Sequence, residues 1–163
     1  MGMVGCFAAV DIETMQRLVE DPEQVEEYLY PDDGEGEPPH YADVDKAWHG
    51  IHYLLTGKAD DAPDPLGSAI LGGDELGEDV GYGPARLLNA DQVRSIASAL
   101  PDEETFKSRF APREMTKAEV YPVVIWERDG DEALEYLVEN YKSLVEFYQG
   151  AAARGQGAIL WLA

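Results

Sequence analysis

The chain has 163 residues, a length typical of one domain with its own hydrophobic core. Hydrophobic residues make up 45% of the sequence, which excludes a disordered chain, and no apolar run is long enough to span a membrane. The 33 acidic and 12 basic side chains give a formal net charge of −21. Such a charge repels nucleic acids and anionic membranes, so we expect neither as a partner, and it attracts basic proteins.

Cysteine use and the opening residues indicate a cytoplasmic protein. Cys6 is the only cysteine, which excludes an internal disulfide and fits a reducing compartment. The opening MGMVGCFAAVDIE lacks the basic segment that precedes the apolar stretch of a secretory signal. We therefore expect the chain to work in the cytoplasm.

The first part of the chain predicts one strand and two short helices. Residues 3–10 are apolar and predict a buried strand, followed by a helix at 11–20. Asp21 and Pro22 are typical of a new helix start, and a polar, acidic loop follows at 31–42. The side chains of the first helix expected to face inward are Ile12, Met15, Leu18 and Val19.

A more amphipathic helix is predicted from Asp43 to Gly57. Asp43 can cap its free N–H groups, and Gly57 can take the left-handed conformation that ends a helix. Asp45, His49 and His52 fall along one border of its apolar stripe. The stripe consists of Val44, Ala47, Trp48, Ile51, Leu54 and Leu55.

Short strands and helices alternate irregularly in the rest of the chain. The sequence predicts an acidic loop at 58–65, a helical turn or short strand at 66–71, and a glycine-rich loop at 72–84. A strand at 86–88 and helices that start after Asn89 and Asp102 are expected next. The chain then continues with a strand at 120–126, a long helix at 131–154 and a strand at 158–162. This pattern predicts one α+β domain over 1–163. Its small mixed sheet packs against several helices, including the long C-terminal one.

Several segments resemble the YfbM-like family of bacterial proteins, known as domain of unknown function 1877. They are MGMVGCFA, DKAWHGIHYLLTG, AILGG followed by GYGPARLLNADQV, YPVVIW, and FYQGAAARGQGAILWL. The resemblance runs nearly end to end and implies a small, single-domain, cytoplasmic α+β protein without an established activity. The residues that match its D-K-x-W…H-x-x-L-T-G pattern are Asp45, Lys46, Trp48, His52, Thr56 and Gly57, whereas His49 lies outside it.

One candidate site is a pocket beside the helix at 43–57. Its expected lining is Asp45, Trp48 and His52, joined by Tyr82 from the GYGP turn and by Arg86. His52 could act there as a general base oriented by Asp45. Two structural alternatives remain open, in which His52 is a hydrogen-bonded core residue and Arg86 pairs with an acidic side chain.

The sequence predicts neither a metal site nor a cofactor. His49 and His52 are spaced i, i+3, whereas a zinc-binding helix of a metalloprotease uses i, i+4 with a glutamate. The GYGP turn lacks the third glycine and the preceding strand of a dinucleotide loop. Cys6, on a buried strand, is expected to be an inert hydrophobic residue.

A second candidate site follows from two intervals without any lysine or arginine, at 18–45 and 59–85. The first contains the acidic cluster Asp32, Asp33, Glu35 and Glu37. The leading hypothesis is therefore a non-enzymatic acidic binding module for a basic protein partner. The alternative is a small enzyme or small-ligand binder that uses a cleft near His52, Asp45, Tyr82 and Arg86.

Overall fold

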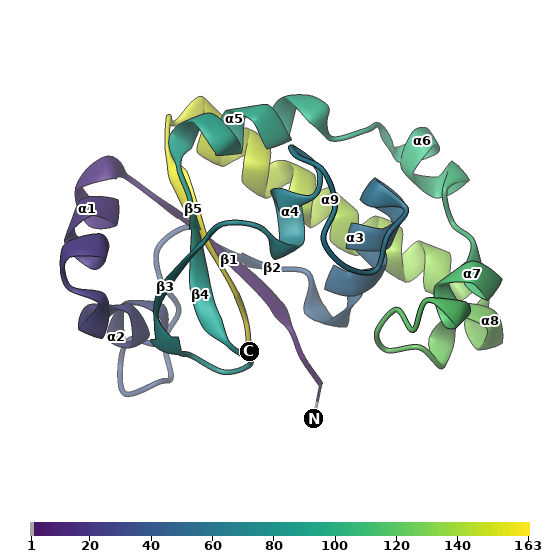
Figure 1. Cartoon of the computed structure of the whole chain (residues 1–163), viewed down its shortest axis with the longest axis horizontal. Coiled ribbons are helices and arrows are strands. Elements are labelled where there is room, and N and C mark those ends of the chain that lie inside the picture. The colour runs from purple at the N-terminus through teal and green to yellow at the C-terminus, as the bar shows by residue number, and fades with distance from the viewer. Residues whose placement is uncertain (1) are drawn as a thin grey trace.

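The computed structural model describes residues 2–163 as one α+β domain (Figure 1). The strands are β1 (Gly5–Val10), β2 (Tyr41–Asp43), β3 (Asp74–Asp79), β4 (Pro84–Leu88) and β5 (Gly157–Leu162). The helices are α1 (Ile12–Glu20), α2 (Val25–Leu29), α3 (Trp48–Thr56), α4 (Ser68–Leu71), α5 (Ala90–Ala99), α6 (Glu103–Ser108), α7 (Pro112–Lys117), α8 (Ile125–Asp129) and α9 (Asp131–Ala153). Two 3-10 turns, η1 (Pro22–Gln24) and η2 (Asp45–Ala47), precede α2 and α3.

The strands form one sheet in the order β2-β1-β5-β4-β3. The predicted α+β class is confirmed, although every strand pair is antiparallel where the sequence suggested a mixed sheet. Strands β1 and β5, from opposite ends of the chain, pair along their whole length. Beyond them, Val4 and Ala163 exchange two backbone hydrogen bonds of 2.8 and 2.9 Å.

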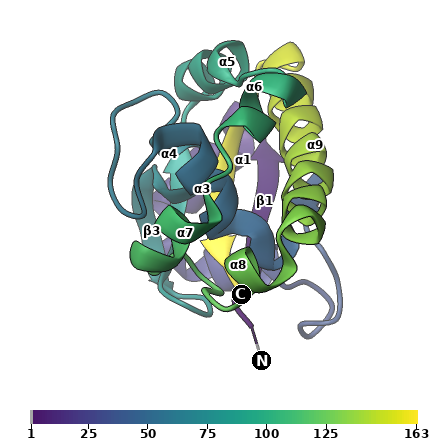
Figure 2. The same cartoon turned by 90° about the vertical axis from the view of Figure 1, so that its right-hand side faces the viewer.

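The sheet separates two hydrophobic cores, because successive residues of a strand face opposite sides. Phe7 and Leu160 are paired and face the larger core, beneath α3 to α9. Cys6 and Trp161 are the next pair and face the smaller core, beneath α1 and α2. Figure 1 shows α1 and α2 on one side of the sheet, and Figure 2 looks onto the helices of the other side.

Three predicted helix caps are confirmed, because capping depends on a few neighbouring residues, whereas Asp21 makes no capping hydrogen bond through its side chain. The side chains of Asp11, Asn89 and Asp102 each accept a backbone N–H at a helix start. Gly57 ends α3 with a φ of 74°, in the left-handed region. Inside α1, however, Ile12 and Val19 are exposed, contrary to the predicted inward stripe.

The secondary structure predicted for two segments was wrong. Residues 72–84 were predicted as loop but contain β3, where one register shift between Leu76 and Asp79 and a positive φ at Gly77 interrupt an otherwise paired strand. Residues 120–126 were predicted as a strand but form a turn and the start of α8. Pro122 lacks an N–H for a sheet ladder, and Trp126 Nε1–H instead donates to the Val120 carbonyl at 2.7 Å.

The helix predicted from Asp43 begins later than expected. Asp43 belongs to β2, a strand that the sequence did not predict, and pairs there with Cys6. Its carboxylate accepts the N–H of Asp45 and so holds the turn between strand and helix. The α-helix itself starts at Trp48, after the 3-10 turn η2.

Two glycines inside helices should respond oppositely to the same substitution. In α3, a Cβ on Gly50 would lie 2.6 Å from both Leu137 and Trp126, which are buried. We expect Gly50→Ala to lower the free energy of unfolding by about 1–3 kcal/mol through overpacking. In α9, a Cβ on Gly150 would meet only the flexible end of Arg154. Gly150→Ala should raise the same quantity by about 0.5–1 kcal/mol through helix propensity.

The measurement is urea unfolding of both variants beside the parent protein. A gain in stability for Gly50→Ala would show that α3 can move away from α8 and α9, and would contradict the close packing described above.

Candidate functional site

The pocket predicted around His52 is not formed as an open cleft. The His52 side chain has 0% exposure, so the core alternative describes it correctly. The loop after α3 covers it: His52 Nε2 lies 2.6 Å from the carbonyl oxygen of Asp60. Since a carbonyl can only accept, Nε2 carries the proton, and the buried Nδ1 has no hydrogen-bond partner among the described residues.

His49, one helical turn earlier, holds the same loop. Its Nε2–H donates to the carbonyl of Ala59 at 2.6 Å, while its Nδ1 accepts the N–H of Tyr121 at 2.8 Å. The imidazole therefore joins the loop to the turn before α8 in its neutral form. Burial lowers the pKa of both His49 and His52 below the ordinary value. The two histidines act as anchors for two successive loop carbonyls.

Arg86 is also a structural anchor. Its guanidinium donates to the carbonyls of Ile70 and Gly72, at 3.0 and 2.9 Å, and so caps the end of α4. The hydroxyl of Tyr148 donates to the neighbouring carbonyl of Ala69. Arg86 thus finds its partners in backbone carbonyls, where the sequence suggested either an acidic side chain or a ligand.

The other three predicted pocket residues have separate environments. Asp45 accepts the hydroxyl of Tyr136 at 2.8 Å. Trp48 is buried, and its Nε1–H donates to the carbonyl of Met3 at 3.0 Å. Tyr82 lies 50% exposed on the turn between β3 and β4. The helical wheel placed Asp45 and His52 together at the border of the buried stripe, but Asp45 lies in the 3-10 turn η2 before α3, and His52 is fully buried beneath the loop that follows the helix.

Cys6 lies deep in the smaller core. Its thiol donates to the carbonyl of Val4 and lies 3.5 Å from the hydroxyl of Tyr41. Burial raises the pKa of the Cys6 thiol to about 11, so at neutral pH it stays protonated. This environment matches the inert role expected from the sequence.

The structure brings the two base-free intervals together in one groove between α2 and β3. We call it the α2–β3 groove; it has a volume of about 380 Å³. Its lining residues are Pro22, Glu23, Val25, Glu26, Gly77, Glu78, Asp79 and Val80. Figure 1 shows β3 beside the segment that leads into α2. Both intervals are apparent in the sequence, but this site was not predicted, because β3 was expected to be loop.

The groove combines an acidic rim with an apolar base. Glu23 and Glu26 are exposed on one wall, and Glu78 and Asp79 on the other. Val25 and Val80 are buried beneath them. No lysine or arginine lines the groove.

The predicted acidic cluster lies in the loop that follows α2 and leads to β2, at the sheet edge opposite β3 (Figures 1 and 2). Its four side chains, Asp32, Asp33, Glu35 and Glu37, are all exposed. Within residues 2–163, the only carboxylates in ion pairs are Asp91, Glu103, Glu114 and Asp129, all outside this region. The four carboxylates of the cluster therefore form no ion pair with the described residues, and a neighbouring base is Arg17 of α1, which lines a shallow hollow with Pro31 and Pro39.

Over residues 2–163, no group of three or more histidine, cysteine, aspartate or glutamate side chains is placed to hold a metal ion. Over the same residues, no helix has the length and apolarity needed to cross a membrane.

Acidification should destabilise the fold through His49 and His52. Because burial lowers the pKa of both imidazoles in the folded protein, the unfolded chain takes up protons first as the pH falls. Their contribution to the free energy of unfolding is therefore complete above the ordinary histidine pKa of about 6.5 and is lost as the pH falls below it. Urea unfolding across a pH series from about 7.5 to 5.5 measures this loss.

A neutral replacement separates this effect from the titration of carboxylates. His52→Gln can still donate to the Asp60 carbonyl but cannot titrate, so its stability should fall less steeply with acidification. His40→Gln, at an exposed histidine, serves as the control for replacing a histidine by glutamine. Equal slopes for the parent and His52→Gln would mean that His52 does not cause the pH dependence.

Comparison with known proteins agrees with this architecture. Residues 1–161 match the family model described as domain of unknown function (DUF1877). The chain is 25% identical to Protein YfbM of Escherichia coli (strain K12), over 98% of this chain and 97% of that protein. It also resembles the crystal structure of YfbM from Escherichia coli, a protein of unknown function, with a TM-score of 0.72 and 26% identity, covering 98% of this chain and 99% of that one. The chain therefore belongs to the DUF1877 family, as its sequence motifs suggested.

Proposed function

We propose that this protein is a non-enzymatic binding module of the cytoplasm, whose acidic end receives a basic segment of a protein partner. The observation that carries the proposal is the α2–β3 groove, where two base-free intervals of the sequence meet. Charge on both walls favours lysine and arginine side chains, while the buried valines favour an apolar side chain between them.

The binding free energy expected of this groove is limited by the solvent exposure of its carboxylates. An exposed ion pair contributes about 0.2–1 kcal/mol, so four rim carboxylates together contribute on the order of 1–4 kcal/mol. That energy is screened by salt and is insufficient alone for tight binding. Apolar contact with the base of the groove would add only a small salt-independent component, because Val25 and Val80 are already nearly buried. The proposed partner segment is therefore basic and amphipathic, rather than uniformly basic.

The acidic loop that follows α2 fits a role in attracting a basic partner from a distance. Asp32, Asp33, Glu35 and Glu37 lie outside the groove, so they need not touch the bound segment. Their field extends about 8–10 Å at physiological ionic strength and can accelerate the approach of a basic partner. In this proposal the groove binds the basic segment, and the loop attracts it electrostatically before contact.

The test compares variants that lose equal charge in different places. The groove variant is Glu23→Gln, Glu26→Gln, Glu78→Gln and Asp79→Asn. The last change keeps the side-chain oxygen that accepts the Gly81 N–H in the turn. The control variant carries Glu132→Gln, Glu135→Gln, Glu139→Gln and Glu146→Gln on the exposed side of α9. The probe is a synthetic peptide in which lysine alternates with valine, and titration calorimetry measures its affinity at two salt concentrations.

We expect the groove variant to lose at least about 1 kcal/mol of binding free energy, roughly fivefold in affinity, relative to the control variant. Neutralising the acidic loop should chiefly slow association, as seen by stopped-flow fluorescence of a labelled peptide. Equal losses in the groove and control variants would indicate only a general attraction to a negative protein, and the proposed site would be rejected.

A further inference from the structure

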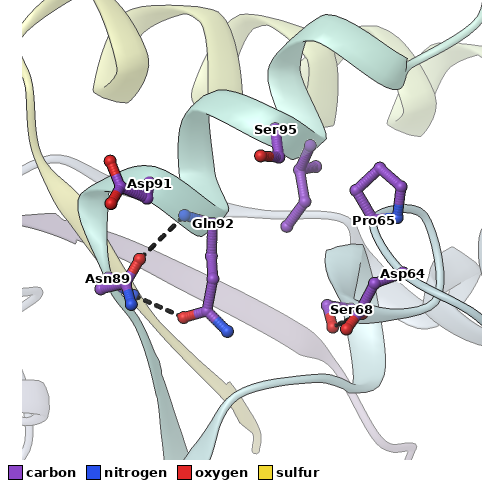
Figure 3. Close-up of a pocket in the computed structure, with 8 residues that line it drawn as sticks. Asp64, Pro65, Ser68, Asn89, Asp91, Gln92 and Ser95 are labelled. Carbon is purple, nitrogen blue, oxygen red and sulfur yellow. Dashed lines mark hydrogen bonds between the residues drawn. The ribbon is translucent and has the colours of Figure 1, made fainter.

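A second cavity lies on the opposite side of the sheet from α2, between α4 and α5 (Figure 3). We call it the α4–α5 cavity; its volume is about 460 Å³, within the range of small-molecule sites. Its wall on the α5 side includes Gln92, Ser95 and Ile96, and its wall on the α4 side includes Asp64, Pro65 and Ser68. Nothing in the acidic-module proposal uses these residues.

The α5 wall presents hydrogen-bond donors because of the way this helix is capped. Asn89 Oδ1 accepts the Gln92 backbone N–H, and Gln92 Oε1 accepts the Asn89 N–H, each at 2.8 Å. The capping box therefore occupies both amide oxygens. Figure 3 shows the Gln92 amide nitrogen turned toward Ser68 and Asp64. Ser95 adds a hydroxyl one turn along α5, and the buried Ile96 supplies an apolar base.

The α4 wall presents a carboxylate. The hydroxyl of Ser68 donates to Asp64 Oδ1, which orients the carboxyl group and leaves Oδ2 for another donor. Figure 3 shows the two side chains together, facing α5 across the cavity. Pro65 adds apolar surface beside them.

This wall is irregular in backbone structure, yet several buried side chains hold it in place. At one end, His49 and His52 bind the carbonyls of Ala59 and Asp60. At the other end, Arg86 and Tyr148 bind the carbonyls of Ile70, Gly72 and Ala69. Side chains from α3, β4 and α9 thus converge on the single segment that carries Asp64 and Ser68. Such support from a surrounding layer is what keeps the groups of a binding site in a fixed geometry.

The charge of the lining residues restricts the kinds of ligand that the cavity can bind. Asp64 and Asp91 are the charged residues of the lining, and Asp91 is already paired with Arg94. An anionic ligand would meet an uncompensated Asp64 and is disfavoured. An ammonium group would instead form a charge-assisted hydrogen bond with Asp64, which is stronger than a neutral one. The donors Gln92 and Ser95 require oxygen atoms at a second position of the ligand.

We propose that the α4–α5 cavity binds a small primary amine that also carries hydroxyl groups, with the ammonium at Asp64 and the hydroxyls at Gln92 and Ser95. This site is independent of the acidic groove, so either proposal can fail without the other. In this arrangement His49, His52, Arg86 and Tyr148 are positioning residues, because they hold the wall and do not line the cavity.

The test uses three sugars of similar shape that differ in charge. D-Glucosamine, D-glucose and D-glucuronate are titrated into the 15N-labelled full chain, and backbone amide shifts are followed by NMR. We expect saturable shifts at Ser68, Gln92 and Ser95 with glucosamine, affinity for glucose weaker by about tenfold, and no saturable shifts with glucuronate. Glucosamine shifts confined to the acidic groove, or their absence at these amides, would overturn the proposal.

Two variants of one loop supply the matched control. Asp64→Asn should remove the preference for glucosamine over glucose while leaving the amide spectrum otherwise folded. Asp61→Asn removes the same charge at an exposed position that does not line the cavity, and should retain the preference. If both variants lost the preference for glucosamine equally, its cause would be the negative charge of the whole protein, and the proposal would be overturned.

Discussion

The pairing of β1 with β5 is the constraint on which the rest of the structure depends. Both strands are buried on both faces, so each contributes side chains to both cores. Neighbouring side chains pack closely against both strands: a Cβ on Gly5 would lie 2.7 Å from Trp48, and a Cβ on Gly157 would overlap the end of Met15. A shift of one residue in this register would exchange the faces of Phe7 and Cys6 and disrupt both cores together.

Features that depend on neighbouring residues were predictable from the sequence. The caps of three helices, the left-handed end of α3 and the extent of α9 all follow from a few adjacent side chains. Strand β3 was not predictable in the same way. Leu76 is its one buried residue, so the strand is defined by its pairing with β4 and not by an apolar pattern of its own.

The candidate sites were likewise predictable only where they depend on residues that are adjacent in the sequence. The base-free intervals could be read directly from the sequence, but their meeting in a groove depends on β3, which was missed. His52 and Arg86 were correctly singled out as unusual polar residues near the core. A hydrogen-bonded core role for His52 was one of the predicted alternatives. The partners of His52 and Arg86 were not foreseen, because both bind backbone carbonyls of segment 59–72, and main-chain partners leave no trace in the sequence.

The adjacency of Val4 and Ala163 has a consequence for how the chain folds. Bringing together residues so far apart in sequence costs on the order of 4–5 kcal/mol of loop-closure entropy. The hairpin of β3 and β4 and the helices around them involve much shorter separations and can form earlier. The central strand pair is thus expected to close late in folding. Until it does, the apolar faces of both end strands remain open to other chains, a period in which the strong negative charge protects the protein from aggregation.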